Sequence, residues 1–220
     1  MKGLFVKDLL LVKNQTRTLP LLVLCGVVMA VSMQASAAVM YLTILGTMIS
    51  VGTISYDEMG NGYSFLFTLP VTRKMYVREK YVFSVLFCLA TILAGLVIGA
   101  AVMLAKGLPA VSSADELLSF TAGAFLAASI MTGSMIPVRL KYGTEKSSIA
   151  LFVIFGVFAV IAITAVKARS ILPEKTVRLI TTALSHIGTG VMLPCIILLS
   201  LVILVISERL SERIVMRKEY

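Results

Sequence analysis

Long runs of apolar residues alternate with short polar stretches along most of the chain. Six of these runs are long enough, or nearly so, to cross roughly 30 Å of bilayer hydrocarbon at about 1.5 Å per residue. They cover residues 18–34, 36–55, 81–105, 117–138, 148–166 and 188–207. The pattern predicts an all-α polytopic membrane protein with six transmembrane helices, the first two of which form a tight hairpin.

The N-terminal residues 2–16 form an amphipathic segment ahead of the first predicted span. Apolar Leu4, Phe5, Leu9, Leu11 and Val12 alternate with Lys2, Lys7, Asp8 and Lys13 at near-helical spacing. This spacing predicts an interfacial helix that lies on the inner leaflet. The alternative is a helix that extends the first span into the cytoplasm.

Composition places the whole chain in the membrane. Hydrophobic residues make up 59% of the 220 residues and charged residues 14%, against roughly 45–50% and 25% in soluble domains. A soluble core of this size cannot absorb that excess, so residues 1–220 are predicted to form a single transmembrane domain. The 3 cysteines lie inside apolar runs without a CxxC motif, which does not favour a metal or redox site.

The net charge of +9 indicates topology rather than nucleic-acid binding, because the basic residues cluster at the ends of apolar runs. Under the positive-inside rule, four basic clusters lie on the cytoplasmic side, and both termini are therefore predicted to be cytoplasmic. These clusters are Lys2, Lys7, Lys13 and Arg17; Arg73, Lys74, Arg78 and Lys80; Arg139, Lys141 and Lys146; and Arg209, Arg213, Arg217 and Lys218.

The chain lacks the sequence patterns that would supply energy for transport. It has no GxxxxGK[ST] motif, so we expect neither ATP hydrolysis nor any other enzymatic activity, and no cofactor, in this chain. The six predicted spans contain no Asp, Glu, Lys, Arg or His, which does not favour an ion-driven carrier. If the protein is a transporter, its energy must come from a partner that docks on a cytoplasmic surface.

The segment between the second and third predicted spans, DEMGNGYSFLFTLPVTRKMYVREK at 57–80, is the best candidate for that surface. Asp57 and Glu58 leave the membrane, and Gly60 and Gly62 suit a tight turn. An aromatic-rich apolar patch follows, which comprises Tyr63, Phe65, Leu66, Phe67 and Leu69.

The second half of this segment predicts the start of a helix. Pro70 disfavours helical geometry at the preceding residue, and Thr72 is a suitable N-cap for a helix that begins near Arg73. Arg73 and Lys74 oppose the helix dipole in that first turn. We therefore expect lipid phosphates or an acidic partner to stabilise them.

The order of these features resembles the ATP-binding-cassette (ABC) type-2 transporter permeases, in particular a small six-span branch found in bacterial exporters. The similarity rests on the amphipathic N-terminus, the two close-set spans and the Leu-Pro-Val-Thr-Arg core at 69–73, with Lys80 and Tyr81 entering the third span. The layout covers the whole chain, and the specific motif about a tenth of it.

The resemblance implies a permease subunit of an exporter in the bacterial cell membrane. It implies a second permease subunit and two separate ATPase subunits, which bind ATP and Mg²⁺. The segment after the second span would form a cytoplasmic coupling helix in a groove of the ATPase. Family substrates include amphipathic peptides, lipids and drugs.

Other interpretations remain open at this stage. Arg139, Lys141 and Lys146, after the fourth span, could form a second inner contact. The 57–80 segment could be an ordinary interfacial loop, and the protein could be a non-transporting immunity, sensor or scaffold protein. The predicted spans carry no charge that would select a cation or an anion as substrate.

Overall fold

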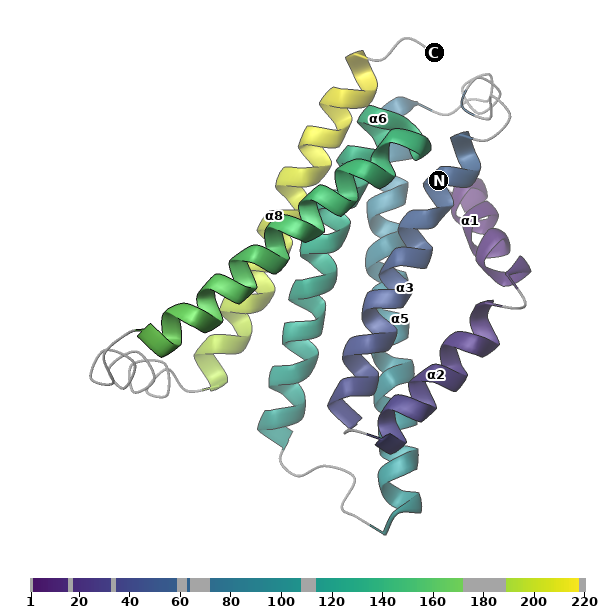
Figure 1. Ribbon diagram of the computed structural model, residues 1–220. Helices are drawn as coiled ribbons and strands as arrows, with labels where there is room; N and C mark the ends of the chain where they lie inside the picture. Colours follow the sequence, from purple (N-terminus) through teal and green to yellow (C-terminus); the bar gives the residue numbers. More distant parts are fainter. Residues whose placement is uncertain are drawn as a thin grey trace.

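The computed structural model describes residues 2–15, 18–32, 35–58, 63, 72–107, 114–171 and 189–217. Its helices are α1 (Lys2–Asn14), α2 (Thr18–Ser32), α3 (Ala35–Glu58), α5 (Arg73–Ala105), α6 (Ala114–Ile171) and α8 (Thr189–Arg217) (Figure 1). No strand occurs in these ranges, and the predicted all-α membrane fold is confirmed.

Four helices in the described ranges are long and apolar enough to cross a membrane. They are Ser36–Glu58, Arg73–Ala105, Leu118–Gly143 and Met192–Arg217, and they contain most or all of the predicted second, third, fourth and sixth spans. Helices α1 and α2 together would make a fifth, bent by 68° between Asn14 and Thr18. The predicted fifth span, 148–166, is helical within α6, and a total of six spans stays a prediction.

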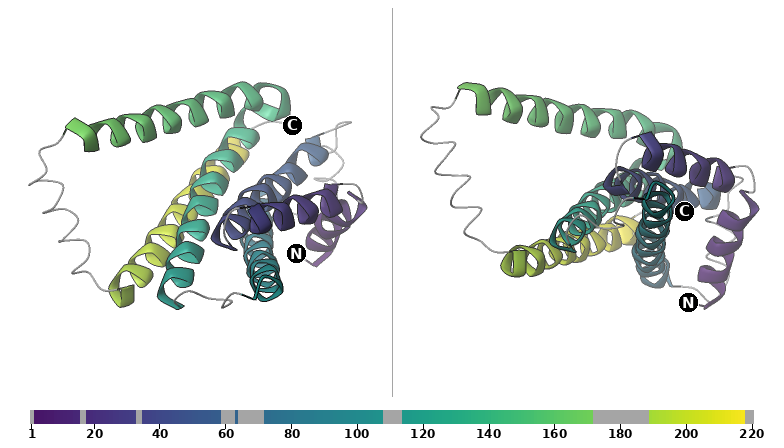
Figure 2. Two further views of the ribbon diagram at one scale, coloured as in Figure 1. Left: turned by 60° about the horizontal axis from the view of Figure 1, so that its bottom comes forward. Right: turned by 90° about the horizontal axis from the view of Figure 1, so that it is seen from below.

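Helix α6 breaks at Gly143 into two halves that point in different directions. Gly143 has φ 75° and ψ 176°, a conformation that is essentially restricted to glycine. A Cβ atom at this position would lie 2.3 Å from Oε1 of Glu58 at the end of α3. Beyond the break, the second half of α6 runs away from the other helices (Figure 2). Glycine is therefore required here for the turn, and a larger residue would also displace the Glu58 side chain.

Helices α3 and α5 pack closely because small residues face each other. A Cβ atom on Gly46 would lie 2.4 Å from the Thr91 side chain, and one on Gly95 would lie 2.7 Å from the Val39 backbone. Small residues at a membrane helix interface allow this approach. The hydroxyl groups along the interface are satisfied locally, since Thr43 and Thr47 each donate to the carbonyl four residues earlier.

Helix α8 is joined to α5 and α6 by buried hydroxyl groups, in addition to an ion pair between Arg78 of α5 and Glu208 at 3.3 Å. The Tyr81 hydroxyl of α5 hydrogen-bonds Ser211 of α8 at 2.9 Å and also Ser207. Ser207 donates to the Gly133 carbonyl of α6 at 2.6 Å. All three side chains are buried, so the contact fixes α8 in the groove between two other helices.

The two N-terminal helices cover the side of α3 and α5. Helix α1 buries Leu4, Asp8 and Val12 at helical spacing and exposes Leu9 and Leu10, which are 50% and 54% accessible. An apolar outer face suits contact with lipid. The predicted helix is confirmed at Lys2–Asn14, and its position on the inner leaflet stays a prediction.

Candidate functional site

We call residues 57–74, which hold the predicted coupling residues of the 57–80 segment, the docking segment, and the structure describes its two ends. Asp57 and Glu58 end α3, while Thr72, Arg73 and Lys74 begin the next helix, α5. The remaining predicted site residues, Gly60, Gly62, Phe65, Leu66, Leu69 and Pro70, lie outside the described residues. The coupling helix and its contact with an ATPase therefore stay predictions.

The two ends of the segment are bonded to each other. The Asp57 carboxylate of α3 accepts a 3.0 Å hydrogen bond from the Tyr76 hydroxyl of α5. It also forms a 2.8 Å ion pair with the Lys80 ammonium group of α5. Lys80 is fully buried, as is the aromatic ring of Tyr76. Because both partners lie within the first two turns of α5, the end of α3 is held directly against the start of α5.

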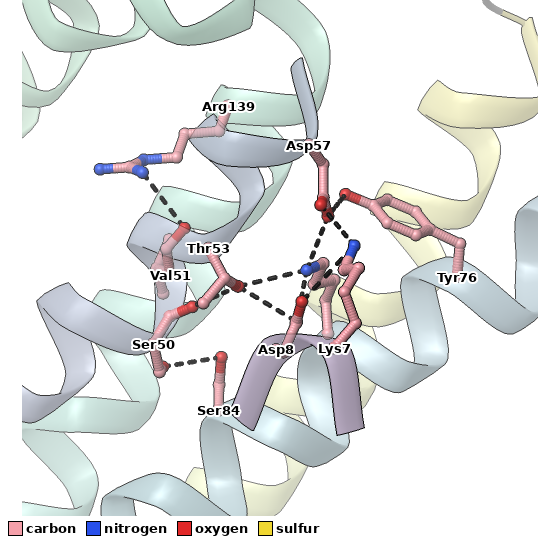
Figure 3. Close-up of polar contacts among 10 residues, drawn as sticks. Lys7, Asp8, Ser50, Val51, Thr53, Asp57, Tyr76, Ser84 and Arg139 are labelled. Atoms are coloured by element: carbon pink, nitrogen blue, oxygen red, sulfur yellow. Dashed lines mark hydrogen bonds and ion pairs between the residues drawn. The ribbon is translucent and has the colours of Figure 1, made fainter. Parts of the chain in front are cut away.

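Helix α1 completes this cluster from the other side (Figure 3). Lys7 pairs with Asp57, and the fully buried Asp8 pairs with Lys80. Lys80 also donates to the Thr53 hydroxyl at 3.2 Å. Two lysines and two aspartates thus neutralise one another across α1, α3 and α5. We call Lys7, Asp8, Asp57 and Lys80 the ion-pair quartet.

A buried quartet of this kind fixes geometry more than it adds stability. Removal of charges from water costs several kcal/mol per ion, and mutual attraction repays this only with good geometry and additional hydrogen bonds. Loss of a single partner leaves a buried charge uncompensated and typically costs about 3–5 kcal/mol. The quartet therefore holds α1 against the two helix ends that flank the docking segment.

Glu79 lies beside the quartet but does not belong to it. Its side chain is 3% exposed, and neither carboxylate oxygen has a hydrogen-bond partner in the described part of the chain. Phe83, one turn later on α5, packs edge-on against Phe5 of α1 with ring centroids 5.5 Å apart. Burial without a hydrogen-bond partner penalises the charged form of a carboxylate, so Glu79 is not expected to stabilise this end of the bundle as an anion.

The predicted start of α5 is confirmed at Thr72. Its side-chain oxygen accepts a 3.3 Å hydrogen bond from the Met75 backbone amide, which satisfies one free donor of the first turn. Arg73 Nη1 donates to the backbone carbonyls of Val215 and Met216 at 3.2 and 3.4 Å. These carbonyls lie at the C-terminal end of α8, where the helix dipole favours a cation such as Arg73. Lys74, the next residue, is exposed.

The three residues of the predicted second inner contact lie in different surroundings. Lys141 is exposed, with its ammonium group 5.0 Å from the Tyr142 ring centroid. Lys146 lies in α6 just beyond the break, and its side chain is outside the described part. Arg139 instead turns inward and donates through Nη1 to the Val51 carbonyl at 3.1 Å and to Ser55 Oγ at 2.7 Å. A role for these residues in partner contact stays a prediction.

The helices extend beyond the apolar runs of the sequence. The charged residues of the site lie in these extensions. Asp57 and Lys80 fall within the candidate spans Ser36–Glu58 and Arg73–Ala105, and Arg139 falls within Leu118–Gly143. The predicted spans were free of charge only because they stopped at residue 55, began at 81 and stopped at 138. A single acidic residue in a basic amphipathic segment, Asp8, was the signal that could have indicated a buried ion pair.

The comparison with known families identifies a family for the chain. A protein-family model described as ABC-2 family transporter protein matches residues 3–216. No curated protein and no solved structure gives a significant match. The matched region includes α1, the quartet and the whole docking segment.

Proposed function

The chain thus belongs to the ABC-2 transporter family and is an ABC permease; we propose that it is the permease subunit of an exporter driven by separate ATPase subunits. Permeases of this family are non-catalytic membrane subunits that generally work with ABC ATPases. The proposed partners are two ATPase subunits, which bind ATP and Mg²⁺, and a second permease subunit. The proposed cargo is hydrophobic or amphipathic, such as a peptide, a lipid or a drug.

The single observation that carries this proposal is the direct bonding between the two helix ends that flank residues 57–74, through Asp57 of α3 and Tyr76 and Lys80 of α5. A force applied to the segment between α3 and α5 reaches both helices at one point, because Asp57 bonds Tyr76 and Lys80. Both helices are long enough to cross the bilayer. A partner bound to the segment would therefore move two membrane helices together rather than bend one loop.

The quartet extends this movement to α1. Lys7 and Asp8 pair with Asp57 and Lys80, so α1 follows the ends of α3 and α5. Arg73 similarly joins the start of α5 to the end of α8. In the proposed mechanism, closure of the ATPases on ATP displaces this connected end of the bundle against the same end of the second subunit.

Charge supports the proposed orientation. The end of the bundle that holds the quartet also holds Arg73, Lys74, Lys141 and Arg217. Cytoplasmic loops carry an excess of Lys and Arg. This end, with both termini, is therefore proposed to face the cytoplasm of a bacterial cell.

The proposed docking role is tested by purifying the permease together with the ATPase encoded beside it. Leu69→Asp puts a charge in the apolar patch of the segment and is expected to abolish co-purification and ATP-driven transport. Leu104→Asp is the matched control, because Leu104 is 68% exposed at the opposite end of α5. The control is expected to retain ATPase binding.

Two outcomes distinguish the docking claim from the transporter claim. Full ATPase binding and transport by Leu69→Asp would show that the segment is not the docking surface. An unaltered permease that binds no ATPase would instead favour a non-transporting immunity, sensor or scaffold protein. The variants of Asp57 are unsuitable for this test, since loss of its carboxylate would disrupt the quartet.

A further inference from the structure

An open groove lies between α2 and α3, on a different face from the quartet. Its volume is about 530 Å³, within the roughly 300–1,000 Å³ typical of ligand pockets. Thr18 and Leu21 line it from α2, Met48 and Tyr56 from α3, and Arg139 from α6. The groove therefore brings three helices to one surface.

The groove is polar at one end and apolar along the rest of its length. Arg139, Ser55 and Tyr56 lie at the polar end, where Gln15 donates to the Tyr56 hydroxyl at 3.3 Å. Leu45 precedes Ser55 in α3 and lies about 15 Å from it along the helix axis, at 1.5 Å per residue. Between the two ends, the lining is Leu22, Met48, Ile49 and Gly52. This gradient matches a molecule with one polar head and an apolar tail.

Arg139 brings an uncompensated charge to the polar end. In the described part of the chain it forms no ion pair with a carboxylate, and it donates to two neutral oxygens, those of the Val51 carbonyl and the Ser55 hydroxyl. Its Nε atom is buried without an acceptor. Glu58 lies at the end of α3, with its carboxylate against Gly143. Figure 3 shows the Arg139 guanidinium group directed away from the quartet.

We propose that this groove binds an acidic phospholipid of the inner leaflet, with its phosphate at Arg139 and an acyl chain along α2 and α3. A charged residue within a membrane helix usually marks a functional partner of opposite charge. The planar guanidinium group suits the two oxygens of a phosphate, and the apolar lining suits an acyl chain. The choice of the inner leaflet rests on the proposed orientation.

A second groove provides an internal control. It has a volume of about 710 Å³ between α6 and α8, and it is lined by Pro137, Val138, Lys141, Leu210, Ile214 and Arg217. Its cations, Lys141 and Arg217, are exposed. It therefore represents general attraction of anionic lipid to a basic surface, without the buried guanidinium group.

The chain contains no tryptophan, so one introduced indole reports on a single groove. Met48→Trp places the reporter in the α2–α3 groove, and Leu210→Trp places it in the α6–α8 groove. The purified permease, with its ATPase if the two are inseparable, is reconstituted in phosphatidylcholine vesicles. Quenching is then compared between brominated phosphatidylglycerol and brominated phosphatidylcholine at equal mole fraction.

At Met48→Trp, we expect phosphatidylglycerol to be preferred roughly tenfold, the size of effect that one charge-assisted contact provides. Arg139→Gln should abolish this preference, Arg139→Lys should keep part of it, and Lys141→Gln should leave it unchanged. At Leu210→Trp, Arg139→Gln should have no effect.

In Met48→Trp with Arg139 intact, equal quenching by the two lipids would overturn the proposal. This test does not require that Arg139→Gln can be obtained folded. A preference that survives in folded Arg139→Gln would also overturn it. Neither result depends on ATPase binding or transport, so failure here is distinguishable from failure of the exporter proposal.

Discussion

Two groups of charges lie near the same end of the bundle, and they differ in how they are neutralised. In the quartet, Lys80 is enclosed by Asp8 and Asp57 and is 1% exposed. Arg139, on the other face of α3, donates only to neutral oxygens in the described part of the chain. The charges of the quartet neutralise one another within the protein, whereas Arg139 has no charged partner in the described part of the chain.

This difference separates a structural role from a binding role. The quartet fixes the ends of the docking segment and has no charge left for a ligand. Arg139 contributes little to the charge balance of the fold but opens onto a groove. Mutations that remove charge should therefore affect stability in the first group and ligand preference in the second.

The largest effect should come from Lys80→Met. Loss of the ammonium group leaves Asp8 and Asp57 buried without their main partner, at an expected cost of about 3–5 kcal/mol. A fall in the apparent unfolding temperature of the purified protein would measure it. Lys74→Met, an exposed lysine in the same helix, should change stability by less than about 0.5 kcal/mol. Equal stability of the two variants would contradict a structural role for the quartet.

A double variant sharpens this prediction. Asp8→Asn combined with Lys80→Met removes both members of one buried pair, so its cost should be smaller than the sum of the two single costs. Strict additivity would show that Asp8 and Lys80 do not interact. Arg139→Gln, measured alongside, should cost clearly less than Lys80→Met.

A smaller effect is expected at Gly143, where helix α6 breaks. Gly143→Ala should destabilise by roughly 1–3 kcal/mol, because φ 75° and ψ 176° suit only glycine and Glu58 occupies the space of a Cβ atom. Gly123→Ala is the matched control in the same helix, since its added Cβ would meet no atom of a neighbouring element within 4 Å in the described part of the chain. The control should be neutral or slightly stabilising. Similar unfolding temperatures for the two variants would show that the break at Gly143 is not required.

Arg73→Gln tests the contact between the start of α5 and the end of α8. Loss of the cation at the α8 carbonyls should cost about 0.3–1 kcal/mol and increase hydrogen exchange in the last turn of α8. Lys74→Gln removes the same charge from the adjacent residue and should leave that turn protected. Unchanged exchange at Val215 and Met216 in Arg73→Gln would remove this link.

Glu79→Gln should have the smallest effect and the opposite sign. An amide of similar volume avoids the burial of a carboxylate without a partner, so stability should stay the same or rise by up to about 1 kcal/mol. The unfolding temperature, compared with that of Lys80→Met, measures this. A large loss of stability would show that Glu79 belongs to the ion-pair cluster after all.

Local features of the fold were predictable because short-range physics determines them. Thr72 caps α5 through its own side chain, and the apolar runs that define the helices can be read directly. The ion pairs could not be predicted, since Lys7 and Asp57 are 50 residues apart and Asp8 and Lys80 are 72 apart. Only the packing of α1 against α3 and α5 brings them together.

Arg139 illustrates the same limit from the other side. The apolar run of the predicted fourth span ends at residue 138, so the sequence predicts that the adjacent Arg139 belongs to a cytoplasmic contact. The helix continues to Gly143, which places the guanidinium group against Val51 and Ser55 of α3. Charge density along the sequence does not distinguish a basic surface from one inward-facing cation.

The most direct test of the account is cross-linking from the docking segment in the assembled transporter. A photoreactive residue at position 69 should cross-link to the ATPase in a manner that changes with ATP, whereas one at position 104, at the other end of α5, should not. Cross-linking from both positions, or from neither in a complex that still hydrolyses ATP, would contradict a role for residues 57–74 in receiving force from the ATPase.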